Sequence, residues 1–165
     1  MYWIPTVVFL IHVAEEFPSF PAWATRHFGV TSRAWYVYSH IPLIAGIIVV
    51  SALAETRPGT LWPLLATAAQ CTLATNGLFH VATTFLFREY SPGVVSGVGL
   101  FFPATAYILH RTVAERLLSQ SDLALAGAAG ILAGAAVIGS LWLPMDIDWR
   151  LRWQRERAVP ARSIT

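Results

Sequence analysis

The sequence predicts an all-α fold, an integral membrane bundle of five transmembrane helices, and three observations support this. Of the 165 residues, 56% are hydrophobic and only 12% are charged, whereas soluble domains carry about 25% charged residues. The mean hydropathy is +0.57. The apolar residues form long runs, and about 20 such residues span a bilayer as a helix. We therefore expect residues 1–145 to form one five-helix transmembrane domain, followed by a tail at residues 146–165.

The first predicted helix covers residues 2–17 and is short for a membrane span. It ends in the stretch "FPSFP", because Pro18 and Pro21 interrupt a helix. A cleaved signal peptide is the competing interpretation, since the following "AWA" resembles a small-residue cleavage site. The segment lacks a basic start and contains one histidine and two glutamates, which favours a retained membrane helix.

The other four predicted helices are separated by turns rich in Pro, Gly and Ser. The second covers residues 33–54 and precedes the turn "ETRPGT". The third covers residues 61–87 and precedes the turn "REYSPG". The fourth covers residues 92–109, with a polar C-terminal extension, and the fifth covers residues 123–143.

The fifth predicted helix is suited to packing, not to chemistry. It has no ionisable residue in "ALAGAAGILAGAAVIGS", and Ala126, Gly130 and Gly134 recur every four residues. Small residues at this spacing let two helix backbones approach closely in lipid. We expect Gly93 and Gly97 to serve the same purpose on the fourth helix.

The distribution of arginine predicts the orientation in the membrane. All eleven basic residues are Arg, and with five spans eight of them fall on one side and three on the other. The larger group is Arg26, Arg33, Arg88, Arg150, Arg152, Arg155, Arg157 and Arg162. The positive-inside rule then gives an external N-terminus and a cytoplasmic C-terminus, in a bacterial-type plasma membrane.

The tail "DIDWRLRWQRER" places Trp149 and Trp153 one helical turn apart among arginines, so we expect it to lie at the headgroup surface. A net charge of +2, with Arg gathered at helix ends and in the tail, argues against a nucleic-acid partner. The expected partners are the lipid bilayer and a small lipophilic substrate. The sequence leaves open whether the chain forms a homodimer.

Polar side chains from distant segments fall in one half of the membrane in this topology. They are His12, Glu15, Glu16, His40, Asn76, His80, Arg88, Glu89 and Tyr90. At about 100° per residue, Glu15 and Glu16 lie on either side of His12, so all three can face one bundle interior. An ionisable side chain at the bilayer centre costs about 2.5–3.5 kcal/mol, and such residues usually face the interior and carry function.

The third predicted helix carries one polar stripe on an otherwise apolar surface. The stripe consists of Thr72, Asn76, His80 and Thr83. On the second helix, Tyr36 and His40 are also one turn apart. We expect these faces to meet the first helix in a shared site. Interhelical hydrogen bonding without catalysis is the alternative interpretation for Asn76 and His80.

Four sequence features together resemble a known family. "IHVAEEF" followed by Trp23, then "NGLFH", then "REYSPG" and finally Pro103 resemble the HXXEE-domain family of small multi-pass membrane proteins, over about residues 8–110. The family pattern is matched by His12, Glu15, Glu16, Asn76, His80, Arg88, Tyr90, Pro92 and Gly93. His40 is not part of it. The resemblance implies an enzymatic role but names no reaction.

We interpret the cluster as the site of a membrane-embedded enzyme that acts on a small lipophilic substrate. A carboxylate pair in an apolar pocket can divide the roles of acid and base, and a histidine can be a second proton carrier. Isomerisation, cyclisation or epoxide opening fits this chemistry. The expected catalytic residues are Glu15, Glu16, His12 and His80. The expected substrate-binding residues are Asn76, Tyr90, Arg88, His40 and Trp23.

A divalent metal is the variant of this hypothesis. The expected ligands are His12, Glu15, Glu16 and His80. A mixed set of imidazoles and carboxylates suits Fe, Mn or Zn. Outside enzymes, buried Glu and His chains also serve proton-coupled transporters, and the motif could instead hold together a non-catalytic membrane assembly subunit. The sequence leaves these classes open.

Overall fold

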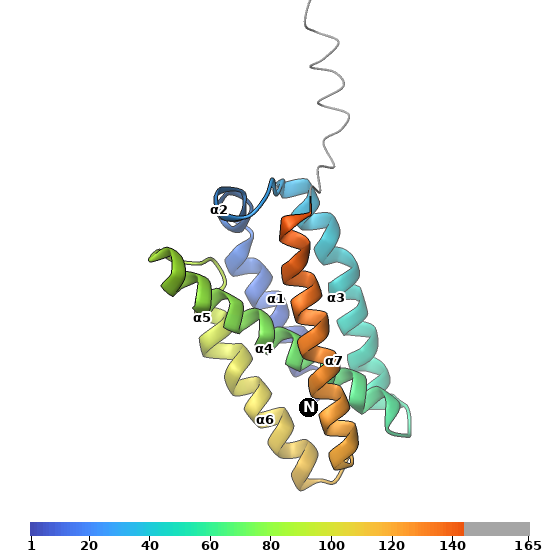
Figure 1. Ribbon diagram of the computed structural model, residues 1–165. Coiled ribbons are helices and arrows are strands. Elements are labelled where there is room, and N and C mark those ends of the chain that lie inside the picture. The colour runs from blue at the N-terminus through green and yellow to red at the C-terminus, as the bar shows by residue number, and fades with distance from the viewer. Residues whose placement is uncertain (144–165) are drawn as a thin grey trace, which may run out of the picture.

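The computed structural model describes residues 1–143, and every regular element in that range is a helix (Figure 1). The elements are α1 (Ile4–Glu16), α2 (Phe20–His27), α3 (Arg33–Thr56), α4 (Leu61–Phe87), α5 (Val94–Ser96), the π-helical η1 (Gly97–Phe101), α6 (Phe102–Ala114), α7 (Gln120–Gly139) and the 3-10 helix η2 (Ser140–Trp142). The predicted interfacial tail, residues 146–165 with Trp149 and Trp153, lies outside the described residues.

The five predicted helices are present, with two differences. The sequence predicts no helix between the first and second spans, but α2 forms there, and Pro21 lies in its first turn, where a proline sacrifices no helical hydrogen bond. The fourth predicted helix is divided into α5, η1 and α6. Pro103, the second residue of α6, cannot donate a backbone hydrogen bond to the π-helical turn before it, and π-turns occur where the regular ladder is interrupted.

Helix α4 lies at the centre of the bundle and packs against α1, α3, α5, η1, α6 and α7. Figure 1 shows it crossing α7 obliquely. Gly130 and Gly134 of α7 make this crossing close: a Cβ atom on Gly130 would lie 2.5 Å from the Ala68 carbonyl oxygen, and one on Gly134 would lie 2.7 Å from Thr75. The packing role predicted for these glycines is confirmed.

Gly130→Ala is expected to destabilise the protein by about 1–3 kcal/mol, because the added methyl group overlaps the α4 backbone. Gly127→Ala is the matched control, since no atom lies within 4 Å of its Cβ position on the same helix. Thermal unfolding in detergent measures both variants. Equal effects of the two substitutions would contradict a close α4–α7 crossing.

Two apolar clusters flank the middle of the bundle. One joins α1, α4, η1 and α6 through Val8, Phe9, Leu73, Phe101 and Ala104. The other joins α2, α3 and η2 through Phe20, Trp23, Ala24, Tyr36 and Leu141. The His12 ring packs against Phe101 of the first cluster, with centroids 4.5 Å apart, and the His80 ring contacts Phe20 of the second at 5.9 Å. The imidazoles therefore lie where the two clusters meet.

Two helices in the described residues are long and apolar enough to cross a membrane, Arg33–Thr56 and Gln120–Trp142. Only 11% and 17% of their most apolar windows are buried, unlike the mostly buried core helix of a soluble protein. Large apolar side chains such as Ile41, Val49 and Leu132 are exposed on these surfaces. Helix α1 has 13 residues, a length of about 20 Å against a hydrocarbon core of about 30 Å. Five spans therefore remain a prediction.

Candidate functional site

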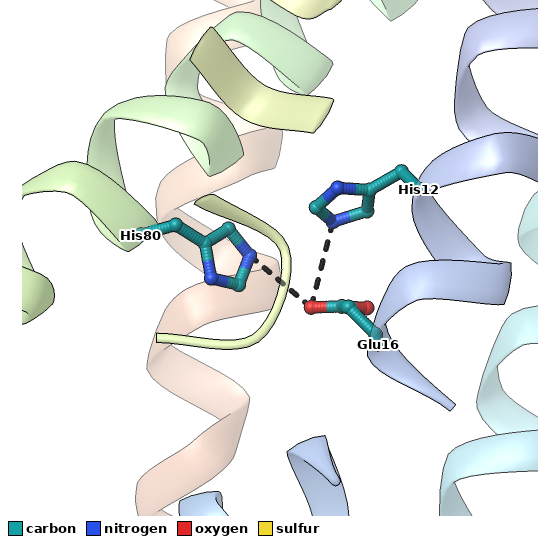
Figure 2. Close-up of side chains that lie close together, drawn as sticks. All are labelled: His12, Glu16 and His80. Carbon is teal, nitrogen blue, oxygen red and sulfur yellow. Dashed lines mark ion pairs between the residues drawn. The ribbon is translucent and has the colours of Figure 1, made fainter. Parts of the chain in front are cut away.

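Glu16 is the centre of a buried polar cluster at the C-terminal end of α1. Glu16 is 3% exposed, and His12 and His80 are fully buried. The Oε1 atom lies 3.4 Å from Nε2 of His12, one turn earlier on α1, and 3.1 Å from Nε2 of His80 on α4. Figure 2 shows both rings pointing at this one carboxylate oxygen. The structure therefore brings together three of the four residues expected to be catalytic.

The second oxygen of Glu16 faces α3. The Tyr36 hydroxyl donates to Oε2 at 2.8 Å, and Nε2 of His40 lies 3.8 Å from the same atom. The Tyr36 and His40 rings are stacked with centroids 3.9 Å apart. His40, which the family pattern does not include, is thus next to Glu16. Tyr36 was not among the expected site residues, although its one-turn spacing from His40 was a signal.

Two serines hold the outer nitrogens of the imidazoles. Nδ1 of His12 lies 2.7 Å from the Ser96 hydroxyl, and Nδ1 of His80 lies 3.0 Å from the Ser91 hydroxyl. Both serines are buried. Such contacts fix the ring orientation and leave Nε2 directed at the centre. Sequence reasoning missed both serines, because a serine in or near a turn carries no signal of its own.

Asn76 completes the centre from α4. Its side-chain amide lies 3.0 Å from Nε2 of His12 and 3.2 Å from Nε2 of His80, in the position assigned to Nδ2. The nitrogen and oxygen of an amide are interchangeable in such an assignment. The two histidine nitrogens therefore face both a carboxylate oxygen and an amide group. This convergence makes the centre suitable for a shared proton or a cation.

Gly93 lies directly against the two imidazoles. It adopts φ +106°, and a Cβ atom there would lie 2.6 Å from Cε1 of His12 and 2.8 Å from Cε1 of His80. Only glycine satisfies both the positive φ and the lack of space. The predicted helix-to-helix packing role of Gly93 is replaced by another: Gly93 precedes α5, and its backbone closes the site beside the histidine rings.

Gly93→Ala is expected to lower the free energy of unfolding by about 3 kcal/mol or more, since backbone strain and a steric overlap with His12 and His80 add together. Gly59→Ala is the control, because Gly59 has φ +100° but no atom within 4 Å of its Cβ position; it is expected to cost about 1 kcal/mol. Thermal unfolding in detergent measures the difference. Similar losses would show that the glycine backbone does not abut the rings.

Glu15 points away from the cluster and binds the start of α5. Its carboxylate accepts hydrogen bonds from the backbone N–H groups of Gly93 at 3.0 Å, Val95 at 3.1 Å and Ser96 at 2.8 Å. The Tyr90 hydroxyl donates a further bond at 2.6 Å. A carboxylate at the start of a helical segment stabilises its free N–H groups. Glu15 therefore holds the chain that carries Ser96 against α1.

Tyr90 keeps its proton in this arrangement. Partial burial raises the pKa of the Tyr90 hydroxyl to about 12, and the hydrogen bond to the Glu15 carboxylate adds to this effect. The hydroxyl is thus a donor at neutral pH. Both residues lie beside the centre and do not contact Glu16, so the structure divides the two motif glutamates between two places.

Arg88 and Glu89 lie outside the Glu16 cluster. Arg88 ends α4 in the left-handed conformation with φ 54°, is exposed, and forms no ion pair within residues 1–143. Glu89 lies 2.6 Å from Nε2 of His27 and accepts from Arg26 at 3.3 Å. The hydrogen bond with His27, followed by that from Arg26, holds the pKa of the Glu89 carboxyl below its usual value. The contacts of Glu89 with Arg26 and His27 therefore connect α2 to the turn that follows α4.

Trp23 is part of the core and does not line the cavity described below. It is 2% exposed and packs on its aromatic neighbours. These are Phe20, Phe28, Phe79 and Phe87. Trp23 thus packs α2 against α4, next to the helix face on which His80 lies.

An apolar cavity of about 470 Å³ reaches the cluster from between α1, α3, α4 and α7. Most of its wall is apolar, with Phe9, Leu43, Ile47 and Val137 among the lining residues. Glu16, His40 and Asn76 also line it. His12 and His80 do not; they lie behind the Glu16 carboxylate. A cavity of this size with a few converging polar groups is typical of small-molecule sites.

The fold and this cluster define a small helical protein with apolar helices and an internal His–Glu centre. Residues 3–108 match the family described as proteins of unknown function with an HXXEE motif, and the chain belongs to this family. His12, Glu15 and Glu16 are the H, E and E of its name. No curated protein and no solved structure matches the chain.

Proposed function

We propose that the chain is a membrane-embedded enzyme that moves a proton on a small lipophilic substrate, with Glu16 as the central acid and base. It spans the bilayer with five helices, and its C-terminus is cytoplasmic. One observation carries the proposal: the apolar cavity leads to the buried carboxylate of Glu16. An apolar wall does not stabilise a highly polar metabolite, whereas a lipophilic molecule lowers its free energy by burying apolar surface against it.

The lining of the cavity supports the roles that we propose for the residues. Glu16 and His40 line it and can touch a substrate, so they are the groups we expect to exchange protons with it. Asn76 lines it as well and can orient a polar group of the substrate. His12 and His80 contact Glu16 from the buried side and set its position. Proton removal from one carbon and its return to another is an isomerisation, the simplest reaction that these groups support.

The experiment uses detergent-solubilised protein, a total lipid extract of the source cells and D₂O. Wild-type protein is expected to generate deuterated or rearranged lipophilic compounds, detected by mass spectrometry, and Glu16→Gln is expected to generate none. Detergent removes any gradient, so product formation distinguishes an enzyme from a proton-coupled transporter. An extract that stays unchanged with wild-type protein, combined with proton-dependent uptake into vesicles, would contradict the proposal and favour transport.

A further inference from the structure

We infer that His12, Glu16, Asn76 and His80 form a four-coordinate site for a divalent metal ion, and that zinc fits it best. The ligand atoms are Nε2 of both histidines, Oε1 of Glu16 and the side-chain oxygen of Asn76. This inference goes beyond the proposed reaction and stands without it, because it concerns what occupies the centre. It also differs from the metal set expected from the sequence, in which Glu15 took the place of Asn76.

Four of the six spacings between the donor atoms match those of a tetrahedron. Zinc binds imidazole nitrogen and carboxylate oxygen at about 2.0–2.1 Å, which places neighbouring ligands of a tetrahedron about 3.3 Å apart. From Oε1 of Glu16, the two Nε2 atoms lie at 3.4 and 3.1 Å. From the Asn76 amide, the same two atoms lie at 3.0 and 3.2 Å. The ligand atoms of His12, Glu16 and His80 all lie within 4.8 Å of one another.

With the amide nitrogen of Asn76 inward, hydrogen bonds cannot satisfy both contacts of either histidine nitrogen. If both Nε2 atoms carry protons for Glu16, they cannot accept from the Asn76 amide nitrogen. If neither carries a proton, two lone pairs face the carboxylate oxygen at 3.1–3.4 Å. A metal ion resolves the conflict, since imidazole nitrogen, carboxylate oxygen and amide oxygen all present lone pairs to it. The amide of Asn76 then has its oxygen inward, an orientation that the same side-chain shape allows.

The surroundings of the ligands are those of a metal site. Ser96 and Ser91 hold the outer nitrogens of His12 and His80, and the Tyr36 hydroxyl binds the free oxygen of Glu16. Such outer contacts orient metal ligands. Burial of a carboxylate also requires a compensating positive charge; within residues 1–143 the ionic neighbours of Glu16 are His12, His40 and His80, not an arginine, and a metal ion bound by neutral imidazoles supplies that charge.

The position of Asn76 links the metal to the cavity. Three ligands lie on the buried side or at the end of the cavity, while the Asn76 side chain is only half-buried and lines the wall. A neutral amide oxygen is the weakest of the four ligands, so it is the one that water or an oxygen atom of a substrate could replace. Catalytic zinc sites keep one position open in this way.

The test measures the metal in the full-length protein, purified in mild detergent with a tag that contains no histidine. Elemental analysis of wild-type protein is expected to give about one equivalent of zinc. After removal of the zinc, Co²⁺ is expected to restore one equivalent and to give the strong visible absorption of a tetrahedral cobalt centre. Less than a tenth of an equivalent of any transition metal, with no such absorption on adding Co²⁺, would overturn the inference.

Variants test the ligand set. His80→Gln and Asn76→Leu are expected to reduce bound metal at least tenfold, whereas Asn76→Asp is expected to retain it, because a carboxylate oxygen replaces the amide oxygen. His110→Ala is the control, since His110 is exposed on α6. Full metal content in folded Asn76→Leu and His80→Gln would overturn the assignment. If these variants fail to fold, the Co²⁺ spectrum of the wild-type protein decides. None of these readouts requires turnover, so they are independent of the proposed reaction.

Discussion

Glu16→Gln is expected to lower turnover about 10³-fold, within the range of about 10²–10⁴ that a positioned acid or base contributes. The amide has nearly the same shape, so the Tyr36 hydroxyl keeps an acceptor at 2.8 Å. The glutamine side chain, unlike the carboxyl group, has no proton acidic enough to be donated and carries no negative charge. Both His12 and His80 then face a neutral group in place of their carboxylate, and the centre loses its chemistry while the helices stay in position.

Glu15→Gln, the same substitution one residue earlier, is expected to leave turnover within about tenfold of wild type. Its amide oxygen, in the place of Oε1, can still accept from the N–H groups of Gly93 and Val95. The variant loses the acceptor of the Ser96 N–H group, which binds Oε2, and a charge at the start of a helical segment, worth about 0.3–1 kcal/mol at a partly exposed position. Glu15→Ala removes the remaining acceptor as well, and is expected to lower the unfolding temperature more than Glu15→Gln does.

The two glutamine variants are compared by turnover of the compound found in the lipid extract, and by thermal unfolding in the same detergent. Because the residues are adjacent and the substitutions identical, expression and detergent effects are matched. A larger loss of turnover in Glu15→Gln than in Glu16→Gln would reverse the roles given to the two glutamates. Equal losses, with equal changes in unfolding temperature, would indicate that both act only through folding.

The sequence could predict much of the fold, because long apolar runs interrupted by prolines and polar turns specify helices locally. Helix α4 has the predicted bounds, and α3 begins at the predicted residue and ends two residues beyond the predicted end. Helix α2 could not be predicted in this way. It is eight residues long, and it depends on Trp23 packing against Phe79 and Phe87 of α4. A helix made stable by tertiary contacts leaves little trace in local periodicity.

The site was predictable only as far as helix faces allow. The spacing of Asn76 and His80 on α4 indicated one polar face, and the structure places both at the centre. Helical spacing could not show which of Glu15 and Glu16 belongs to the site, because both lie close to the face of the helix that carries His12. The separation depends on where the start of α5 lies, since its N–H groups capture Glu15 and leave Glu16 for the histidines.

Tertiary placement also explains the residues that were missed. Ser91 and Ser96 act on His80 and His12 from 11 and 84 residues away in the chain. Helical periodicity does not connect these pairs, because α4 ends before Ser91 and several helices lie between His12 and Ser96. Serine is also common in turns for reasons unrelated to a site. Arg88 shows the converse. Its position after α4 made it a reasonable partner for a glutamate, yet its left-handed backbone directs the chain into a turn and the side chain is exposed.

Ala136→Phe is expected to lower kcat/KM about 100-fold by occupying the cavity, with bound metal and unfolding temperature unchanged. Ala136 lines the cavity from α7, whereas Glu16 lines it from α1. A phenyl ring there competes with the apolar part of a substrate, and the loss of that burial appears as a higher KM. At about 25 cal/mol for each Å² of apolar surface, excluding roughly 100 Å² of substrate is sufficient for such an effect.

Ala135→Phe is the control for this substitution. Ala135 is the preceding residue of α7, is exposed, and is not part of the cavity wall, so its phenyl ring is expected to leave kcat/KM within about twofold. Steady-state kinetics of both variants, in detergent and in reconstituted vesicles, measure the difference. If both variants retain wild-type kinetics, the substrate does not enter through this cavity. The second pocket, beside Tyr90 and Glu15, does not include Glu16, so this result would contradict the proposed function.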